Sequence, residues 1–537
     1  MQIITSLNPP KTHQQLVNLQ IFAKPSRNRK VLLPAGFHFP KMAVKSHLSG
    51  TSAESWDVVQ LEDSQVLECP PIEPGPYKVT DTGLYKLSNE NECNKKEHNA
   101  RIATDISRHL SLDLEKIFEI FEEEAHTYGD TYNQHIRPVF KEYMGEEKHS
   151  SNWFRFSGSS VWLKDFNIHF VVSRLMITEN GNRVNPRLSM LLAQVFDEQW
   201  NEIEDVRLVF PSNNGEGASR FRVNGQDFTS YRFPRILPVP FVLGGSGFYW
   251  GAEDPRMTLV RNKNGHDEPL VVFNAFQTKE VVEEDGKTQI KGFRSIFMCF
   301  PFQVQKGKQL LEGNRETTDD HYFTHTKQVI IDGEPERVVE KNWTPFVSSG
   351  GEYTKHVMFA TSFEPFKVIK CDLWTDSPTC QVEESQNGDV GQLRGGTPLV
   401  SIKRVDAEDK EFFAGLARSH LTHCGCGIHF YRPNLVVVAR IGTTWSLAQV
   451  SSSVDLGMDL IPWDDEERVN VHGVLKALND SRYWEFAVGE NTVSPIKCAQ
   501  ERSNEFCKAY AAKVQKRSSF GEFVGAIKRW VGVISWG

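Results

Sequence analysis

The chain of 537 residues lacks features that would each assign it to a broad class of protein. It has no clustered run of lysine and arginine, and its formal net charge is −8, so the basic footprint of a nucleic-acid-binding protein is missing. It has no apolar stretch long enough for a signal peptide or a membrane span, either in residues 1–30 or later. We therefore expect no nucleic-acid partner and no membrane-spanning helix.

Catalytic and cofactor-binding signatures are also missing. There is no Walker A loop, no Rossmann glycine fingerprint, no HExxH and no G-x-S-x-G. There is no Asp-x-Asp triplet, the carboxylate pair with which many nucleotide-sugar transferases hold a divalent metal. We expect chemistry that needs neither a metal nor a cofactor.

The nine cysteines are an odd number and leave the redox compartment open. Cys371 and Cys380 are spaced to close a short loop in an oxidising compartment, whereas Cys424-Gly425-Cys426 is too tight for an easy disulfide. Glycosylation sequons begin at Asn342 and Asn479, and Asn479 is the better acceptor because Asn342 lies in a candidate site segment.

Four regions are expected along the chain. Residues 1–95 are interpreted as irregular, and 96–149 as a helical accessory segment with Asp113 as an N-cap. The apolar face of its first helix comprises Leu110, Leu114, Ile117, Phe121 and Ala125, and a second short helix follows with Ile136, Val139, Phe140 and Tyr143. Residues 150–500 form the core, and 501–537 an amphipathic tail that either packs on the protein or lies on a membrane surface.

The core is expected to be all-β, because short β-rich runs alternate with turn residues and no long amphipathic helix interrupts them. The expected strands are 160–163, 168–177, 188–196, 257–260, 270–276, 295–302, 357–363 and 435–440. Polar and glycine-containing lead-ins at 157–160, 251–256, 341–346, 394–398 and 451–453 suggest a five-bladed β-propeller, in which they converge on the central channel. The 35 Phe and 12 Trp residues fit sheet packing, stacking on sugar rings, or both.

The hexapeptide Gly251-Ala252-Glu253-Asp254-Pro255-Arg256 is the strongest candidate for chemistry. Pro255 restricts the backbone and biases Asp254 toward an extended conformation, which would hold a carboxylate rigidly at the start of a strand. Arg256 would keep a neighbouring carboxylate ionised. The alternative is a structural turn in which Asp254 and Arg256 pair with each other.

Cations accompany the other lead-ins and suit a phosphate or diphosphate if they converge on one channel. Each one alone is more often a surface cation or a salt-bridge partner. The segments concerned are Lys341-Asn342-Trp343-Thr344-Pro345, Arg394-Gly395-Gly396-Thr397-Pro398, Arg418-Ser419-His420 and Tyr431-Arg432-Pro433. The two glycines beside Arg394 would allow a ligand to approach the backbone closely.

With these motifs in order, the chain resembles the fungal β-mannosyltransferases that add β-1,2-linked mannose to cell-wall mannan, over about residues 150–500. The blocks that carry the resemblance are Asn185–Leu188 with Ala193–Asp197 and Trp200, Tyr249–Arg256, Glu268–Asn274, Glu340–Phe346, Leu393–Thr397 and Cys424–Cys426 with Tyr431–Pro433. The Glu-Asp-Pro-Arg, Lys-Asn-Trp and Gly-Gly-Thr-Pro elements are also similar to those of β-mannoside phosphorylases, which are five-bladed propellers.

The resemblance implies roles for particular residues. Asp254 would be the catalytic carboxylate, and Arg256, Lys341 and Arg394 would face the phosphates. The substrate-binding candidates are Glu253, Arg256, Lys341, Asn342, Arg394, Arg418, His420, Tyr431 and Arg432. Trp250 or Trp343 would stack on a mannose ring or serve in packing.

The resemblance implies an inverting transfer of mannose from GDP-mannose to a mannan or N-glycan acceptor in the Golgi. Members of that family usually begin with a membrane anchor, which is not visible here, so membrane association stays open. Two alternatives remain: a β-mannoside phosphorylase or hydrolase on the same fold, with Asp254 as an acid, and a non-catalytic mannan-binding propeller.

Overall fold

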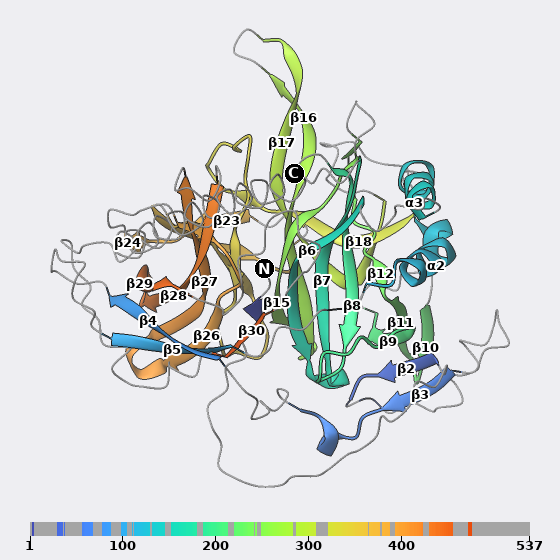
Figure 1. Cartoon of the computed structure of the whole chain (residues 1–537), viewed down its shortest axis with the longest axis horizontal. Coiled ribbons are helices and arrows are strands. Elements are labelled where there is room, and N and C mark those ends of the chain that lie inside the picture. The colour runs from blue at the N-terminus through green and yellow to red at the C-terminus, as the bar shows by residue number, and fades with distance from the viewer. Residues whose placement is uncertain are drawn as a thin grey trace, which may run out of the picture.

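A computed structural model of the chain describes the core from residue 152 to 454, with gaps at 180–185, 213–219, 241, 244–248, 283–285, 308–320, 364, 376–378, 387–392 and 423–428. It also describes residues 110 and 112–144 without 129–131, and short segments at 3–4, 29–35, 37, 56–67, 78–86, 98–104 and 471–474. Figure 1 shows a body of β-sheets with two helices at one edge. The expected tail at 501–537, Cys424–Cys426 and Asn479 lie outside the described residues.

Two of the sheets are four-stranded antiparallel meanders. The first contains β6 (Trp153–Leu163), β7 (Ile168–Thr178), β8 (Pro186–Phe196) and β12 (Arg235–Ile236). The second contains β15 (Glu253–Arg261), β16 (Asp267–Val282), β17 (Thr288–Lys306) and β18 (Tyr322–Gln328). The hairpin of β16 and β17 rises above the body in Figure 1.

Two further sheets repeat the meander and add strands to it. The third contains β20 (Thr344–Phe346), β21 (His356–Phe363), β22 (Phe366–Asp372) and β23 (Thr379–Val382), with β19 (Ile330–Ile331) at its edge. The fourth contains β25 (Leu393–Gly395), β26 (Val400–Val405), β27 (Lys410–Thr422), β28 (His429–Ile441) and β29 (Thr444–Ser453), joined by β24 (Ser385–Gln386), β4 (Lys78–Lys86), β5 (His98–Thr104), β30 (Val471–Val474) and β1 (Ile3–Ile4).

A fifth sheet mixes parallel and antiparallel pairs. It contains β2 (Arg29–Leu33), β3 (Trp56–Gln60), β9 (Val206–Pro211), β10 (Arg220–Val223) and β11 (Gln226–Phe233). A short pair, β13 (Val242–Leu243) with β14 (Tyr249–Trp250), leads into β15. Strands β2, β3 and β4 correct the expectation that residues 1–95 are irregular throughout, because β2 pairs with β9 and β4 pairs with β29, which are strands more than 100 residues later in the chain.

Residues with left-handed backbone conformation form the tight turns between consecutive strands of the meanders. Asn167 has a φ of 49° at the turn between β6 and β7, and Gly265 has a φ of 82° between β15 and β16. In the second turn the Asn262 side chain accepts hydrogen bonds from the backbone N–H groups of Asn264 and His266. Such side-chain-to-backbone bonds favour a tight reversal over a continued strand.

The sheets pack face to face around a propeller-like core. One apolar cluster joins the first, second and fifth sheets, a second cluster joins the second and third sheets, and another joins the third and fourth. The first strand of each meander lies at a sheet edge, and β15 contacts both β6 and β20. The all-β prediction and the propeller-like arrangement are confirmed, and each of the eight expected strands lies within an observed one.

The expected number of five blades is not reached, because the described residues contain four meander sheets. The lead-in expected at 451–453 instead forms the end of β29. There the buried hydroxyl of Ser451 accepts a hydrogen bond from the backbone N–H of Leu435, so this serine serves a sheet interior and not the start of a blade.

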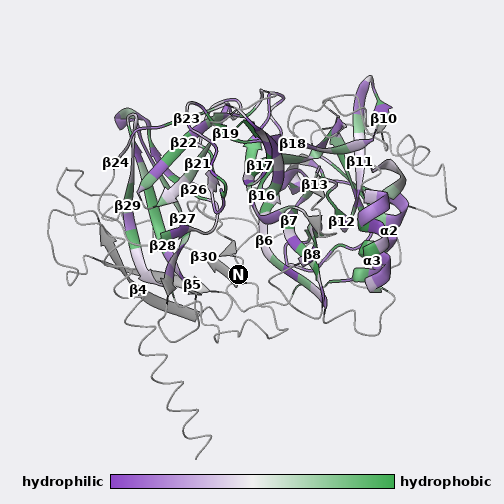
Figure 2. Cartoon of the chain, turned by 90° about the horizontal axis from the view of Figure 1, so that it is seen from above, coloured by the Kyte–Doolittle hydropathy of each residue, from purple (hydrophilic) through white to green (hydrophobic). Residues whose placement is uncertain are grey.

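The two expected helices are present as α2 (Leu114–Glu124) and α3 (Arg137–Met144), but residues 98–104 of the segment expected to be helical form strand β5 instead. Asp113 caps α2 by accepting from the backbone N–H of Lys116 at 2.9 Å. A single π-turn (Tyr132–Ile136) precedes α3. Both helices pack on the first sheet, and Figure 2 shows that each carries both hydrophilic and hydrophobic residues. No helix among the described residues has the length and apolar character needed to cross a bilayer.

Candidate active site

Three residues from neighbouring sheets meet with backbone in the left-handed region. Ser157 in β6, Asp254 in β15 and Asn342 before β20 have φ values of 52°, 51° and 64°. Such conformations cost on the order of 1–3 kcal/mol in non-glycine residues and cluster at functional sites. The φ of Asp254 corrects the expectation of an extended residue: the pairing register shifts between Glu253 and Arg256, and this bulge turns the backbone at Asp254.

Asp254 carries a partly exposed carboxylate surrounded by cations. Its side chain is 35% exposed, and Arg174 lies 3.5 Å from its Oδ1. The hydroxyl of Ser157 donates to the same oxygen at 3.2 Å. Burial alone raises the pKa of Asp254, but the charges of Arg174, Arg256 and Arg418 and the Ser157 hydrogen bond outweigh it and lower that pKa below its ordinary value. The carboxylate is therefore ionised at neutral pH.

Glu253 is held by three partners instead of facing an open space. Its two oxygens receive the Asn274 amide at 2.9 Å, Arg294 at 3.2 Å and Arg174 at 3.3 Å, and its side chain is 15% exposed. The structure therefore gives Glu253 an anchoring position beside Asp254.

Arg174 is a site residue that the sequence reasoning missed. It bridges Glu253 and Asp254, and its Nε donates to Ser189 at 2.8 Å. The available signal was an arginine inside the apolar strand 168–177, because a buried arginine requires a carboxylate or carbonyl partner.

Arg256 fastens the second sheet to the loops that begin the third and fourth sheets. Its donors end on Gly396 O at 2.6 Å, Trp343 O at 3.0 Å, Gly395 O at 3.1 Å and Asn342 Oδ1 at 3.3 Å. Burial, together with the charge of Arg418, lowers the pKa of Arg256 to about 9, so it stays cationic at neutral pH. Four of its five N–H groups point at protein acceptors, which favours a structural role over direct phosphate binding.

Gly395 and Gly396 are required by close contact within the chain. A Cβ at Gly395 would lie 2.2 Å from the backbone oxygen of Asn342, and one at Gly396 would lie 2.1 Å from that of Leu416. We expected these glycines to leave room for a ligand. In the structure their missing side chains instead allow close backbone packing, which brings their carbonyl oxygens within hydrogen-bond distance of Arg256 and Arg418.

Arg418 is the second half-buried cation of the site. Its Nη2 donates to Asn342 Oδ1 at 2.9 Å and to Gly395 O at 3.1 Å. Burial lowers its pKa, an effect partly offset by Asp254 and Tyr431. Its other terminal nitrogen, Nη1, has no hydrogen-bond partner within the described part of the chain, so it can donate to a ligand.

Lys341 and Arg394 lie at the rim of the site. Both side chains are exposed, and neither forms a hydrogen bond or ion pair with the described residues. Lys341 precedes the strained Asn342. Arg394 in β25 lies opposite Arg418 in β27, and directly opposed residues of an antiparallel pair share one face of the sheet. Arg394 and Arg418 thus present two positive charges on one face.

The β27–β28 pair divides the remaining candidates between two faces. His420 lies opposite Tyr431, on the same face as Arg418, whereas Arg432 lies opposite Ser419 on the other face. The structure therefore brings His420 and Tyr431 toward Arg418 and leaves Arg432 out of that group.

The structure decides between the two interpretations of Trp343. Its side chain is 2% exposed, packs against Phe359 and donates to Glu340 at 3.0 Å. It serves core packing and not sugar stacking. The side chain of Trp250 lies outside the described residues.

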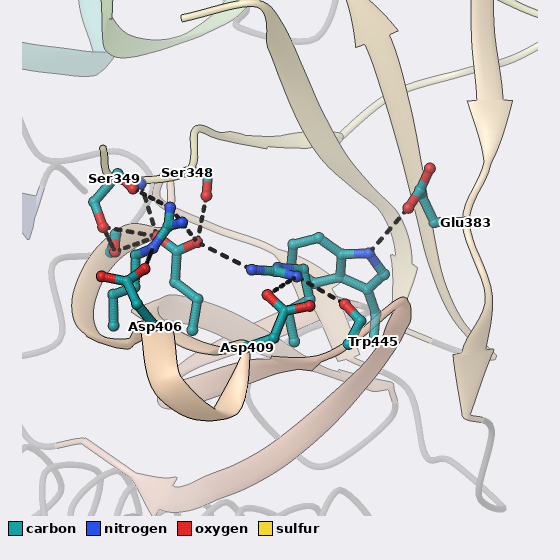
Figure 3. Close-up of polar contacts among 11 residues, drawn as sticks. Ser348, Ser349, Glu383, Asp406, Asp409 and Trp445 are labelled. Atoms are coloured by element: carbon teal, nitrogen blue, oxygen red, sulfur yellow. Dashed lines mark hydrogen bonds and ion pairs between the residues drawn. The ribbon is translucent and has the colours of Figure 1, made fainter. Parts of the chain in front are cut away.

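A second polar cluster surrounds Glu411, at the opposite end of β27. The Glu411 side chain is 0% exposed and accepts from the Ser349 backbone N–H at 2.7 Å and hydroxyl at 2.9 Å, the Ser401 hydroxyl at 2.7 Å, and the Ser348 hydroxyl. Arg404 and Arg440 lie 4.0 Å away and pair with Asp406 and Asp409 (Figure 3). Both oxygens of the buried Glu411 carboxylate accept hydrogen bonds from the chain, so the cluster is structural.

Metal binding at either cluster has no support from ligand geometry in the part of the chain described, where no group of three His, Cys, Asp or Glu side chains is arranged to hold an ion. Metal independence stays a prediction.

Comparisons with known proteins place these residues in context. The sequence model of a family described as β-mannosyltransferases matches residues 92–506. The chain is 33% identical to β-mannosyltransferase 5 of Candida albicans, over 66% of this chain and 61% of that protein. It is 35% identical to β-mannosyltransferase 8 of the same organism over 58% and 49%, and 30% identical to β-mannosyltransferase 3 of Komagataella phaffii over 72% and 55%.

The chain thus spans from about half to just under two thirds of the length of these relatives. Among solved structures, a β-1,3-galactosidase of family GH43 with galactodeoxynojirimycin is similar over 54% of this chain and 75% of that chain, at 10% identity and a TM-score of 0.24. A likeness this low bears on neither fold nor function.

Proposed function

The chain belongs to the β-mannosyltransferase family, and from this premise we propose that it transfers mannose from GDP-mannose to a mannan or N-glycan acceptor with inversion. Two features support the proposal: an ionised carboxylate at the junction of four sheets, and cations on one side of it with donors directed outward. The named relatives are β-mannosyltransferases, and an inverting transfer requires a base and a site for the leaving group.

The proposed reaction is a single in-line displacement. The acceptor 2-hydroxyl attacks the anomeric carbon of the α-linked donor, the bond from that carbon to the diphosphate oxygen breaks, and GDP leaves. Asp254 takes the proton from the attacking hydroxyl, and a β-linkage results. Arg418, Arg394 and Lys341 stabilise the charge that develops on the departing diphosphate.

The cations and the hydroxyl around Asp254 carry the choice of reaction: Arg174 lies 3.5 Å from its Oδ1, Ser157 donates to the same oxygen at 3.2 Å, and these partners lower the pKa of Asp254. A phosphorylase or hydrolase would need Asp254 protonated, because it must donate a proton to the glycosidic oxygen. A transferase needs it ionised, so that it can accept one. Arg174 and Ser157 favour the ionised form before any substrate binds.

The rest of the charge arrangement also fits this assignment. Glu253 already receives Arg174, Arg294 and Asn274, so it is less suited to move a proton than its neighbour Asp254. Arg256 donates mainly to backbone carbonyls. It would contribute by holding the Asn342 side chain in position and by placing a positive charge near Asp254. Proton transfer is therefore assigned to Asp254 alone.

Thermal unfolding with two ligands tests the proposal. A transferase must hold a guanosine beyond the first phosphate, whereas a phosphorylase needs room for orthophosphate only. A ligand that binds the folded state raises its stability by RT ln(1 + [L]/Kd). We expect GDP to raise Tm measurably and orthophosphate to raise it little at equal concentration. The opposite ranking, with release of mannose 1-phosphate from β-mannobiose and phosphate, would make the phosphorylase assignment correct.

The compartment proposed is the lumen of the Golgi. The Cys371–Cys380 disulfide between β22 and β23 supports an oxidising compartment, since such bonds are rare in the cytosol. Quantifying free thiols in unfolded protein, with and without reductant, tests this point: two fewer thiols before reduction are expected from this pair.

A further inference from the structure

An exposed aromatic ring lies just beyond the cation that faces the proposed diphosphate. Tyr431 in β28 is 47% exposed, and its ring is stacked on that of His420, with centroids 4.9 Å apart and planes 15° apart. The guanidinium carbon of Arg418 lies 5.2 Å from the centroid of the Tyr431 ring. Arg418 itself interacts with the charge of Asp254. The site therefore runs from carboxylate to guanidinium to aromatic ring.

This order matches the order of groups in a sugar nucleotide. The sugar carbon that reacts must lie near Asp254, and the diphosphate near Arg418. The group that follows the diphosphate is the nucleoside. In-line displacement puts the acceptor on the opposite side of the anomeric carbon from the diphosphate, so an aromatic ring on the diphosphate side is placed for the donor and not for the acceptor.

We propose that Tyr431, supported by His420, is the platform on which the purine base of the donor nucleotide stacks. The inference rests on the proposed function and assigns a part of the donor that the catalytic residues do not contact. A tyrosine ring suits this role because bases stack on aromatic faces and because only two side-chain torsions must be fixed. The His420 ring fixes the plane of Tyr431 in advance, and the cation of Arg418 beside that ring lies near the phosphates.

Calorimetric titration of the full chain with GDP and with inorganic pyrophosphate tests the platform. For Tyr431→Ala we expect GDP affinity to fall by roughly 5- to 150-fold, the range for loss of one base–aromatic stack, with pyrophosphate affinity unchanged. Tyr431→Phe keeps the ring and should bind GDP like the wild type. An equal loss for pyrophosphate would mean that Tyr431 acts only by supporting Arg418, and unchanged GDP affinity would mean that the base binds elsewhere; either result overturns the proposal.

A matched control lies at the other end of the sheets. Tyr353 also has a cation beside its ring, with Lys355 Nζ 5.7 Å from the centroid, and it belongs to the loop that leads from Ser349 to β21. Tyr353→Ala should leave GDP affinity unchanged. A loss there equal to that of Tyr431→Ala would show a general effect on folding and overturn the site-specific role.

Transfer kinetics separate failure of this inference from failure of the proposed function. If the wild type transfers mannose from GDP-mannose and Tyr431→Ala raises the KM for the donor alone, the platform is upheld. If the variant raises the KM for the acceptor alone, Tyr431 stacks on a sugar and the inference fails while the transferase stands. Wild-type protein that neither binds GDP nor transfers mannose would overturn the proposed function itself.

Discussion

Asp254 and Glu411 are two carboxylates in different surroundings, and the difference assigns a reactive role to Asp254 and a structural role to Glu411. Both lie among arginines and serines, at opposite ends of the sheets. Arg418 and Glu411 are seven residues apart in β27, about 23 Å at roughly 3.3 Å per residue. Glu411 is 0% exposed and receives hydrogen bonds from three serines. Asp254 is 35% exposed and receives one from Ser157.

The difference shows which surroundings leave a carboxylate able to react with a substrate. Both oxygens of Glu411 accept hydrogen bonds from the chain, and its side chain has no exposed surface for a substrate to contact. Asp254 is kept ionised mainly by charge, from Arg174, Arg256 and Arg418, which leaves part of its surface open. Its left-handed backbone adds strain, whereas Glu411 lies in a regular strand. A general base is expected to have cations near its carboxylate and to keep an oxygen lone pair free for the substrate proton.

Among the substitutions that test the difference between the two carboxylates, Asp254→Asn has the largest expected effect. The amide has nearly the same shape but cannot accept the proton, so we expect kcat for mannosyl transfer to fall by about 10²–10⁴-fold. Circular dichroism and unfolding should show a folded protein with near-wild-type stability. Near-wild-type turnover would remove Asp254 from the mechanism. A wild-type protein with no transfer activity would favour a non-catalytic glycan-binding protein.

Glu411→Gln should give the reverse pattern. One oxygen becomes an amide donor that faces either the hydroxyl of Ser348 or those of Ser349 and Ser401, and Arg404 and Arg440 lose a nearby negative charge. We expect the free energy of unfolding to fall by about 1.5–3 kcal/mol, the scale of charge-assisted hydrogen bonds, with kcat unchanged. Urea denaturation measures it, and a stable but inactive variant would erase the distinction between the two carboxylates.

Lys341→Ala and Arg394→Ala should each weaken GDP binding. One charge-assisted contact to the diphosphate is lost in each case, at a cost of roughly 1.5–3 kcal/mol in binding free energy. Arg222→Ala is the control, because Arg222 is 64% exposed and pairs with Asp227 in the fifth sheet. Calorimetry with GDP decides the matter: affinities unchanged in both site variants would mean that the diphosphate binds elsewhere.

The smallest expected effect is in the pH profile. Because folding lowers the pKa of Asp254, its ionised form stabilises the protein above the ordinary carboxyl pKa of about 4, and that stabilisation is lost as pH falls through the lowered value. As a base, Asp254 is ionised throughout pH 5–7. We expect it to contribute no acid limb to kcat/KM for transfer in that range. A rate that rises about tenfold per pH unit as pH falls would indicate an acid.

Much of the fold and the centre of the site were predictable from the sequence, because they depend on local pattern. The strands of the first two sheets follow from apolar runs bounded by turn residues, and Asp254 stands out by its Gly-rich approach and Pro255. The partners of Asp254 depend on tertiary contacts. Arg174 lies 80 positions away in an apolar strand, where sequence alone does not show which carboxylate it meets.

Other contacts depend on tertiary structure in the same way. From the sequence, Arg256 and the two glycines were interpreted as ligand-binding elements. In the structure the glycines approach the backbone of Asn342 and Leu416, and their carbonyls accept hydrogen bonds from the arginines. The serines at 451–453 were interpreted as the start of a blade because the sequence does not show which strand they pair with. In the structure Ser451 accepts a hydrogen bond from the backbone N–H of Leu435 in the neighbouring strand. Strands β2 and β3 were missed because their partner β9 is distant in the chain.

The most direct measurement is the linkage formed by the purified chain supplied with GDP-mannose and an α-mannan oligosaccharide in EDTA, with the product analysed by NMR. We expect a new β-1,2-linked mannose with GDP released in equal amount, lost in Asp254→Asn and retained in Glu411→Gln. An α-linked product, or orthophosphate-dependent release of mannose 1-phosphate with no use of GDP-mannose, would contradict the proposed transfer.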